Sequence, residues 1–132
     1  MLTQPWHDVV ERPTFPCTEL TSPEFTATLV GEDGTTPIPG STLSSLALTL
    51  YADNGDLTII NDRDHQDVLQ QNGVTVDEFG LLTWILDPLD LRILDDGLPF
   101  ERHIALLEWT WGAGRAGKFE LVLVVRNLAK VS

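Results

Sequence analysis

The stretch that decides the fold covers residues 102–127 and reads RHIALLEWTWGAGRAGKFELVLVVRN. Residues 102–111 alternate in character and residues 118–126 alternate again, which is the pattern of strands with one buried face. Residues 112–117 between them are rich in glycine, which favours a turn. We therefore predict that the two runs pair as neighbouring strands. Their apolar faces would carry His103, Ala105, Leu107, Trp109 and Trp111 on the first strand and Phe119, Leu121, Leu123 and Val125 on the second.

A hairpin this hydrophobic is not stable alone in water, so the rest of the chain must supply a second layer. A short helix is expected over residues 65–71, with Asp64 as its cap. A second one is expected over residues 88–94, after Asp87. Many short strands separated by turns predict an all-β fold, a mostly antiparallel β-sandwich with one or two short helices in its connections. The further strands are expected at residues 24–31, 43–51, 57–61, 74–76 and 81–86.

Residues 1–22 differ from the rest of the chain because prolines interrupt any regular element there. The segment is nevertheless too apolar for a simple solvated tail, so we expect it to lie extended over its own domain or over a neighbouring subunit. We therefore divide the chain into an extended N-terminal arm, residues 1–22, and a β-sandwich domain, residues 23–132. The arm residues predicted to contact a partner are Trp6, Val9, Val10, Phe15 and Leu20.

The charge of the chain limits its partners. Its 132 residues include 20 acidic and 8 basic ones, for a formal net charge of −12. An acidic surface repels phosphate groups, so we expect neither nucleic acid nor an anionic membrane as a partner. The single cysteine, Cys17, permits no internal disulfide. Residues 1–5 lack the basic start of a signal peptide, and no apolar run reaches the length of a membrane span.

The sequence contains no motif that predicts catalysis. Asp62, Asp64 and Asp67 are close together, but they lack the glycine and distal glutamate of a calcium-binding loop. The three histidines are not spaced as zinc ligands, and no serine lies in a Gly-x-Ser-x-Gly motif. We therefore predict that the protein is not an enzyme, with no catalytic residue, no metal and no cofactor.

The tryptophans are the strongest indication of a small-molecule site. Some sandwich modules stack sugars on exposed aromatic rings. Trp84 and Trp109 are predicted to lie in the core, as bulky aromatic residues on an apolar face do. Trp111 is nearest the turn and is the candidate for an exposed sugar platform. Burial of all three tryptophans would remove that platform.

Several short runs resemble small structural proteins of tailed bacteriophages. They are TIINDRD at residues 58–64, VL at residues 68–69, GLLTW at residues 80–84 and ALLEWTW at residues 105–111. The second half of the chain is also similar to the immunoglobulin-like domain at the start of phage baseplate upper proteins. The chain departs from the baseplate type because it has no downstream trimerising region and begins with a proline-rich segment.

The resemblance implies an immunoglobulin-like β-sandwich and a non-enzymatic structural role in the virion. The virion itself would be assembled in the host cytoplasm. The expected place is the head surface, as a decoration or cement protein, or the head–tail junction. The expected partners are other virion proteins, namely capsid, portal, adaptor or tail subunits, contacted by several copies of the chain. The alternative is a carbohydrate-binding module that uses Trp111. Fold alone favours neither hypothesis.

Overall fold

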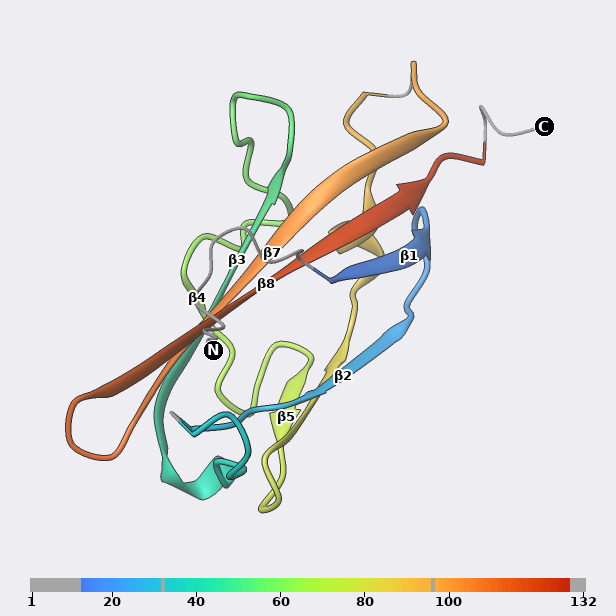
Figure 1. Cartoon of the computed structure of the whole chain (residues 1–132). Coiled ribbons are helices and arrows are strands. Elements are labelled where there is room, and N and C mark those ends of the chain that lie inside the picture. The colour runs from blue at the N-terminus through green and yellow to red at the C-terminus, as the bar shows by residue number, and fades with distance from the viewer. Residues whose placement is uncertain (1–12, 32, 96, 129–132) are drawn as a thin grey trace.

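The computed structural model describes residues 13–31, 33–95 and 97–128, and it is a sandwich of two sheets (Figure 1). Every strand pairing is antiparallel except that of β1 with β8, which is parallel. The five-stranded sheet A has the order β1 (Thr14–Thr18), β8 (Arg115–Arg126), β7 (Phe100–Trp111), β3 (Leu43–Ala52) and β4 (Gln66–Asp67). The three-stranded sheet B has the order β2 (Glu24–Thr28), β6 (Leu81–Ile85) and β5 (Val74–Val76).

This strand order is that of an immunoglobulin-like sandwich. Strands β2, β6 and β5 take the positions of strands B, E and D, while β3, β7 and β8 take those of C, F and G. Strand β4 then extends the second sheet as an additional strand does in variable-type domains. The predicted fold class, an all-β immunoglobulin-like sandwich with short helical turns, is confirmed.

The predicted hairpin is the longest element of the molecule and forms the diagonal of Figure 1. Strands β7 and β8 pair without a register shift from Phe100 opposite Arg126 to Trp111 opposite Arg115. Gly112 and Gly114 have φ values of 58° and 82°, a conformation that residues with a Cβ rarely adopt. The turn is shorter than predicted, because residues 115–117 already belong to β8.

The core lies between the two sheets and is built by the predicted alternation. His103, Ala105, Leu107 and Trp109 on β7 are buried, whereas Trp111 is only half-buried. Seven large apolar residues of strands β3, β6, β7 and β8 are all buried there. They are Leu48, Leu50, Trp84, Leu107, Trp109, Leu121 and Leu123.

Two predicted elements are wrong. The helix expected over residues 65–71 is replaced by β4 and turns, because His65 and Gln70 have positive φ values that an α-helix excludes. The side chain of Gln70 instead forms two hydrogen bonds with the backbone of Val76. The strand expected over residues 57–61 is reduced to a single bridge between Tyr51 and Ile59, because the backbone turns with positive φ at both ends of the run.

The second predicted helix is a short 3-10 turn, η2 (Pro88–Leu91), and ends before residue 94. Asp87 caps it as predicted, and its carboxylate accepts a hydrogen bond of 2.9 Å from the backbone N–H of Leu89. A second 3-10 turn, η1 (Gly40–Thr42), leads into β3. No helix in the described part of the chain has the length and apolar character needed to cross a lipid bilayer.

Strand β1 places residues 14–18 in the sandwich, although the sequence assigned them to the arm. Pro16 fits there because β1 is an edge strand, where a missing N–H breaks no ladder. Phe15 packs against Phe25 with ring centroids 5.5 Å apart, so it contributes to the core of its own domain. Trp6, Val9 and Val10 lie outside the described residues.

Candidate functional site

Trp111 lies beside an apolar hollow between the sheets, which we call the lateral groove. Its volume is about 300 Å³, near the lower limit for small-molecule sites in proteins. Strands β2, β7 and β8 all contribute to its wall. The lining includes Ala27, Leu29, Trp109, Trp111, Gly117 and Phe119.

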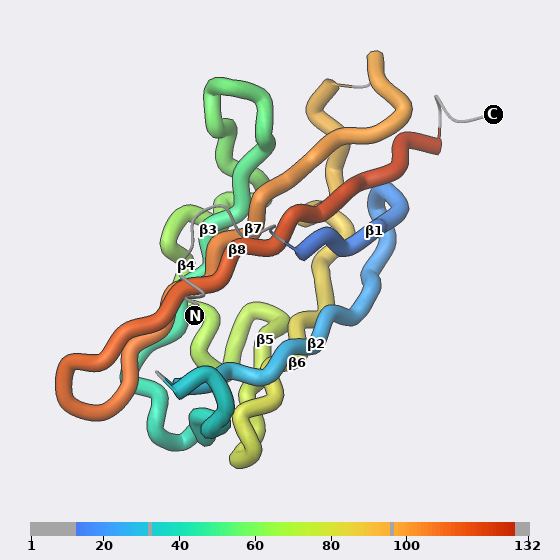
Figure 2. Tube along the Cα trace, viewed as in Figure 1, coloured from blue at the N-terminus to red at the C-terminus, as the bar shows by residue number. Residues whose placement is uncertain are grey.

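The lateral groove is open because the strands on this side of the sandwich are short. Strand β1 pairs with β8 only over residues 122–126, and β1 lies beside only that part of β8 in Figure 2. Among the described residues, no strand flanks residues 116–118 on the side away from β7. Strand β2 is the edge of sheet B on the same side of the sandwich. Two sheet edges therefore border the groove.

The indole of Trp109 contributes a buried polar group to the lateral groove. Trp109 is only 7% exposed, and its Nε1–H has no hydrogen-bond partner among residues 13–31, 33–95 and 97–128. Gly117 opposite Trp109 makes room for the ring, since a Cβ at Gly117 would lie 2.6–2.7 Å from the indole atoms. A buried N–H without an acceptor is unfavourable by roughly 1–3 kcal/mol. An acceptor atom in the groove would remove that cost.

A second, more polar hollow of about 540 Å³ shares Trp111 with the lateral groove and includes Asp33, Thr36 and Arg115. The side-chain and backbone hydrogen bonds from Thr36, with one from the backbone of Thr35, lower the pKa of Asp33 from 3.8 to about 2. Asp33 is therefore anionic at any physiological pH. Trp111 thus stands between an apolar hollow and a charged one.

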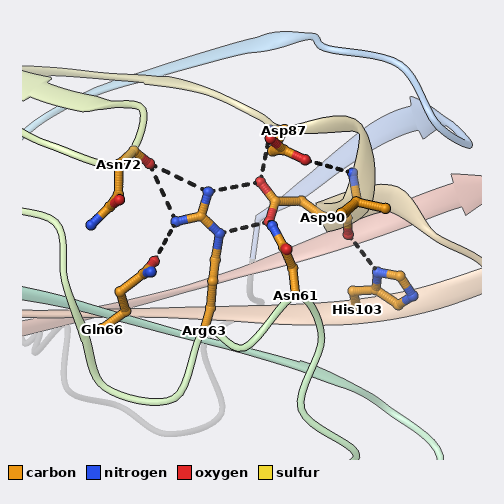
Figure 3. Close-up of polar contacts among 8 residues, drawn as sticks. Asn61, Arg63, Gln66, Asn72, Asp87, Asp90 and His103 are labelled. Carbon is orange, nitrogen blue, oxygen red and sulfur yellow. Dashed lines mark hydrogen bonds and ion pairs between the residues drawn. The ribbon is translucent and has the colours of Figure 1, made fainter.

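The most buried charges form a different cluster, the Arg63 network (Figure 3). The carboxylate of Asp90 accepts hydrogen bonds of 2.6 and 3.1 Å from the Nε and Nη2 atoms of Arg63. It also accepts bonds from the side chain of Asn61 and the backbone N–H of Asp87. Arg63 is 4% exposed and Asp90 fully buried. This pair ties the segment before β4 to the η2 turn.

The Arg63 network is built for structure and not for binding. The remaining donors of Arg63 reach the side chain of Gln66 and the carbonyl of Asn72, so all five of its N–H groups have protein acceptors. Its guanidinium also lies 5.7 Å from the ring centroid of Trp84. A fully satisfied network of this kind fixes one arrangement of its segments and leaves no donor for a ligand.

His103 is held in the same region by two acceptors. Its Nδ1 contacts the backbone carbonyl of Asp90 at 3.1 Å, and its Nε2 contacts the carboxylate of Glu101. Glu101 also accepts from the backbone N–H groups of Leu94 and Asp95. His103 therefore anchors the loop that precedes β7.

The segments that meet at one end of the sandwich carry exposed apolar side chains, and we call this end the apolar end. The β1–β2 turn, the loop before β7 and the end of β8 meet there, at the upper right of Figure 1. Backbone hydrogen bonds join these segments, from Leu20 to Leu91 and from Asn127 to Pro99. The side chains are between 43% and 55% exposed, and they belong to Leu20, Leu94, Leu98, Phe100 and Leu128.

The remaining candidate residues have local roles. Asp64 contacts the ring of His65 at 2.7 Å, and Asp67 accepts from the backbone N–H of Leu69. Both acids therefore organise the turns around β4. Cys17 is buried on β1, and its burial raises the pKa of the thiol to about 11, which disfavours a nucleophilic role.

No protein-family model matches the chain, and a comparison with curated proteins finds no match. The resemblance to phage structural proteins therefore stays a prediction. Sequence reasoning singled out Trp111 but missed the groove beside it, because the groove depends on where β1 ends along β8. It also missed the Arg63 network, whose members are separated by up to 29 residues in sequence.

Proposed function

We propose that this protein is a non-enzymatic structural component of a tailed-phage particle, placed on the head surface or at the head–tail junction. It would hold neighbouring virion subunits by protein–protein contact. The observation that carries the proposal is the apolar end. The segments that meet there carry five exposed large apolar side chains, on a chain with a net charge of −12. Exposed apolar residues that gather in one place mark interaction sites more often than scattered ones do.

The surface charge and the apolar end have opposite effects on association. A strongly acidic surface repels other acidic surfaces, whereas an apolar end associates through burial of its side chains. Full burial of a leucine or phenylalanine contributes roughly 1.5–3 kcal/mol, and these residues still have about half of that burial to gain. Leu20 belongs both to the apolar end and to the predicted contact residues. Trp6, Val9 and Val10 stay predicted contact residues outside the described part of the chain, whereas Phe15 packs against the core of its own domain.

Incorporation into particles tests this proposal. We expect Leu98→Ser combined with Leu128→Ser to lower the copy number of the protein in purified particles at least tenfold, with an unchanged melting temperature. Leu57→Ser is the matched control, because Leu57 is 56% exposed and lies outside the apolar end. Equal incorporation of both variants, or absence of the wild-type chain from particles, would contradict the proposal.

Carbohydrate binding is the second candidate, favoured by the half-buried ring of Trp111 beside the charged hollow. Asp33 and Arg115 offer the hydrogen-bonding groups that a sugar requires next to an aromatic ring. A glycan array probed with the wild-type protein and with Trp111→Ala separates the two functions. Specific binding that is lost in the variant would favour the sugar module.

A further inference from the structure

We propose that a hollow beside the Arg63 network binds a neutral polyhydroxylated ligand, such as a sugar unit of a glycan. The hollow has a volume of about 560 Å³ and a mainly polar wall, and we call it the polar hollow. It shares no lining residue with the apolar end or the lateral groove, so the inference stands whether or not the chain belongs to a phage particle. The lining includes Ser22, Asn61, Gln66, Asn72, Ile85 and Asp87.

The first step is that the buried pair of Arg63 and Asp90 holds residues that line the polar hollow. Asn61 donates to the carboxylate of Asp90 at 2.9 Å, and Gln66 accepts from Nη1 of Arg63 at 2.8 Å. Arg63 also reaches the backbone carbonyl of Asn72 with two of its N–H groups, as Figure 3 shows. Three amide residues of the wall are therefore fixed by buried charged groups.

The second step is that stability alone does not explain such a pair. Replacing a buried ion pair by apolar residues of similar volume is often neutral or stabilising. A binding site, in contrast, needs supporting residues that lock its ligand-contacting side chains in one geometry. Arg63 has no donor left for a ligand, yet it bonds directly to two residues of the wall. The pair therefore fits a positioning role.

The backbone beside the polar hollow supports that role. Asn61 and Asn72 have φ values of 54° and 55°, and all but one of the described non-glycine residues with positive φ lie within residues 57–72. Such conformations persist only where surrounding contacts hold them, and they gather at binding sites and switch regions. Here Arg63 and Asp90 supply the contacts. The chain thus maintains an irregular loop whose amide groups border a hollow.

The third step is the chemistry of the wall. Within the described ranges, the hydroxyl of Ser22, the side-chain oxygen of Asn61 and the side-chain nitrogen of Gln66 have no hydrogen-bond partner. These groups donate and accept, as the hydroxyls of a sugar do. An anion is disfavoured because Asp87 lies in the wall. A divalent cation prefers several carboxylates, and no group of three metal-ligating side chains exists in the described part of the chain.

The size and the margin of the polar hollow agree with such a ligand. Its volume lies within the range of about 300–1,000 Å³ that is usual for small-molecule sites. Ile85 is 54% exposed in the lining and offers apolar surface to the C–H face of a sugar ring. The carboxylate of Asp87 keeps one oxygen that no described residue contacts, and this oxygen can accept from a ligand hydroxyl.

The test begins with a glycan array probed with the full-length protein. Titration of ¹⁵N-labelled protein with a bound oligosaccharide should shift the side-chain amide signals of Asn61, Gln66 and Asn72. Ser22→Leu removes the hydroxyl and fills part of the polar hollow, so it should raise the Kd of that oligosaccharide at least tenfold. Ser44→Leu is the matched control, because Ser44 is exposed and lies outside the lining, and it should change the Kd less than twofold.

A double variant tests the positioning role. Arg63→Met with Asp90→Leu replaces the charges by apolar groups, so it should keep much of the stability but raise the Kd at least tenfold. Trp111→Ala should leave the Kd unchanged, because Trp111 borders other hollows. A wild-type Kd in the double variant would show that the pair does not position the wall.

Three results would overturn the binding site itself. They are an array that yields no binder, an oligosaccharide that leaves the three amide signals in place, and binding that survives Ser22→Leu but is lost in Trp111→Ala. The last result would assign the sugar to the hollows beside Trp111. Because none of these measurements involves the apolar end, they leave the particle-incorporation test unaffected.

Discussion

At one lateral edge of the sandwich, beside β4 and β5, buried charges link the segments next to the polar hollow of about 560 Å³. At the opposite edge, beside β1 and β2, the lateral groove is mainly apolar. We call the first edge closed, because Arg63 bonds to Asp90 and lies over the ring of Trp84, and the second edge open, because no such bonds cross it among the described residues. Both edges contain a buried tryptophan whose N–H has no partner in the described part of the chain.

The difference teaches that the connections, and not the sheets, decide which edge is open. The segment around Arg63 adds a polar network whose members satisfy one another, and such a network favours one arrangement of the chain. Among the described residues, strand β1 pairs with only five residues of β8. We therefore expect variants at the closed edge to lower the free energy of unfolding more than variants at the open edge. The following variants test that assignment.

The largest effect is expected from the two buried tryptophans. Trp84→Ala should lower the free energy of unfolding by about 5 kcal/mol and Trp109→Ala by about 3 kcal/mol, the two ends of the range for such truncations. Trp84 also loses its contact with Arg63, whereas Trp109 already borders a hollow. Denaturant unfolding measures both. Equal losses would mean that the two edges are packed equally well.

A somewhat smaller loss is expected when the Arg63 network is broken. Asp90→Ala leaves the guanidinium of Arg63 buried without its carboxylate, which typically lowers the free energy of unfolding by about 3 kcal/mol or more. Asp87→Ala is the control, because it removes an exposed helix cap three residues away and should lower stability by about 1 kcal/mol. A double variant, Arg63→Met with Asp90→Leu, should recover much of the loss.

If Asp90→Ala and Asp87→Ala have the same midpoint in urea, the Arg63 network does not close the edge. Recovery in the double variant would show that the cost comes from an uncompensated charge and not from lost volume. Unfolding slopes of the variants should match that of the wild type, so that midpoints report stability.

The alternation of residues 102–126 was sufficient to predict the sandwich and its central hairpin, because the inward-facing side chains of both strands are buried, although Ile104 and Val122 on the opposite face are buried as well. The wrong predictions concern two short segments. Residues 65–71 resemble a capped helix, but Gln70 bonds to Val76 and holds the chain in turns. Residues 57–61 resemble a strand, but positive φ at Leu57 and Asn61 limits the pairing to one bridge. Tertiary contacts outweigh local propensity at both places.

The candidate site was predicted less completely than the fold. Trp111 stood out because a tryptophan near a turn often remains accessible. The lateral groove arises from the end of β1 opposite Val122, and the apolar end from three segments that are far apart in sequence. No periodicity within one segment reports how far a strand extends along its neighbour. Predicting such sites requires knowledge of how the strands are aligned in the sheet.

A substitution that fills the lateral groove should lower the free energy of unfolding less than one that removes a core side chain. Gly117→Val places side-chain atoms against the indole of Trp109, since even a Cβ would lie 2.6–2.7 Å from that ring. Such overpacking should lower the free energy of unfolding by about 1–3 kcal/mol. Denaturant unfolding measures the loss. A Gly117→Val variant as stable as the wild type would mean that the ring of Trp109 moves into the groove without cost.

The smallest effect concerns Cys17, which reports how firmly β1 closes its part of the open edge. Burial raises the pKa of this thiol from an ordinary 9.0 to about 11, so at pH 8 the thiolate fraction should be lowered roughly a hundredfold. We expect alkylation by iodoacetamide to be at least a hundredfold slower than in the urea-unfolded chain, and to accelerate as the pH rises towards 11. Because only the unprotected thiolate reacts, the native rate measures local opening of β1. A native rate close to the unfolded one would mean that β1 detaches readily and that the open edge extends over the whole of β8.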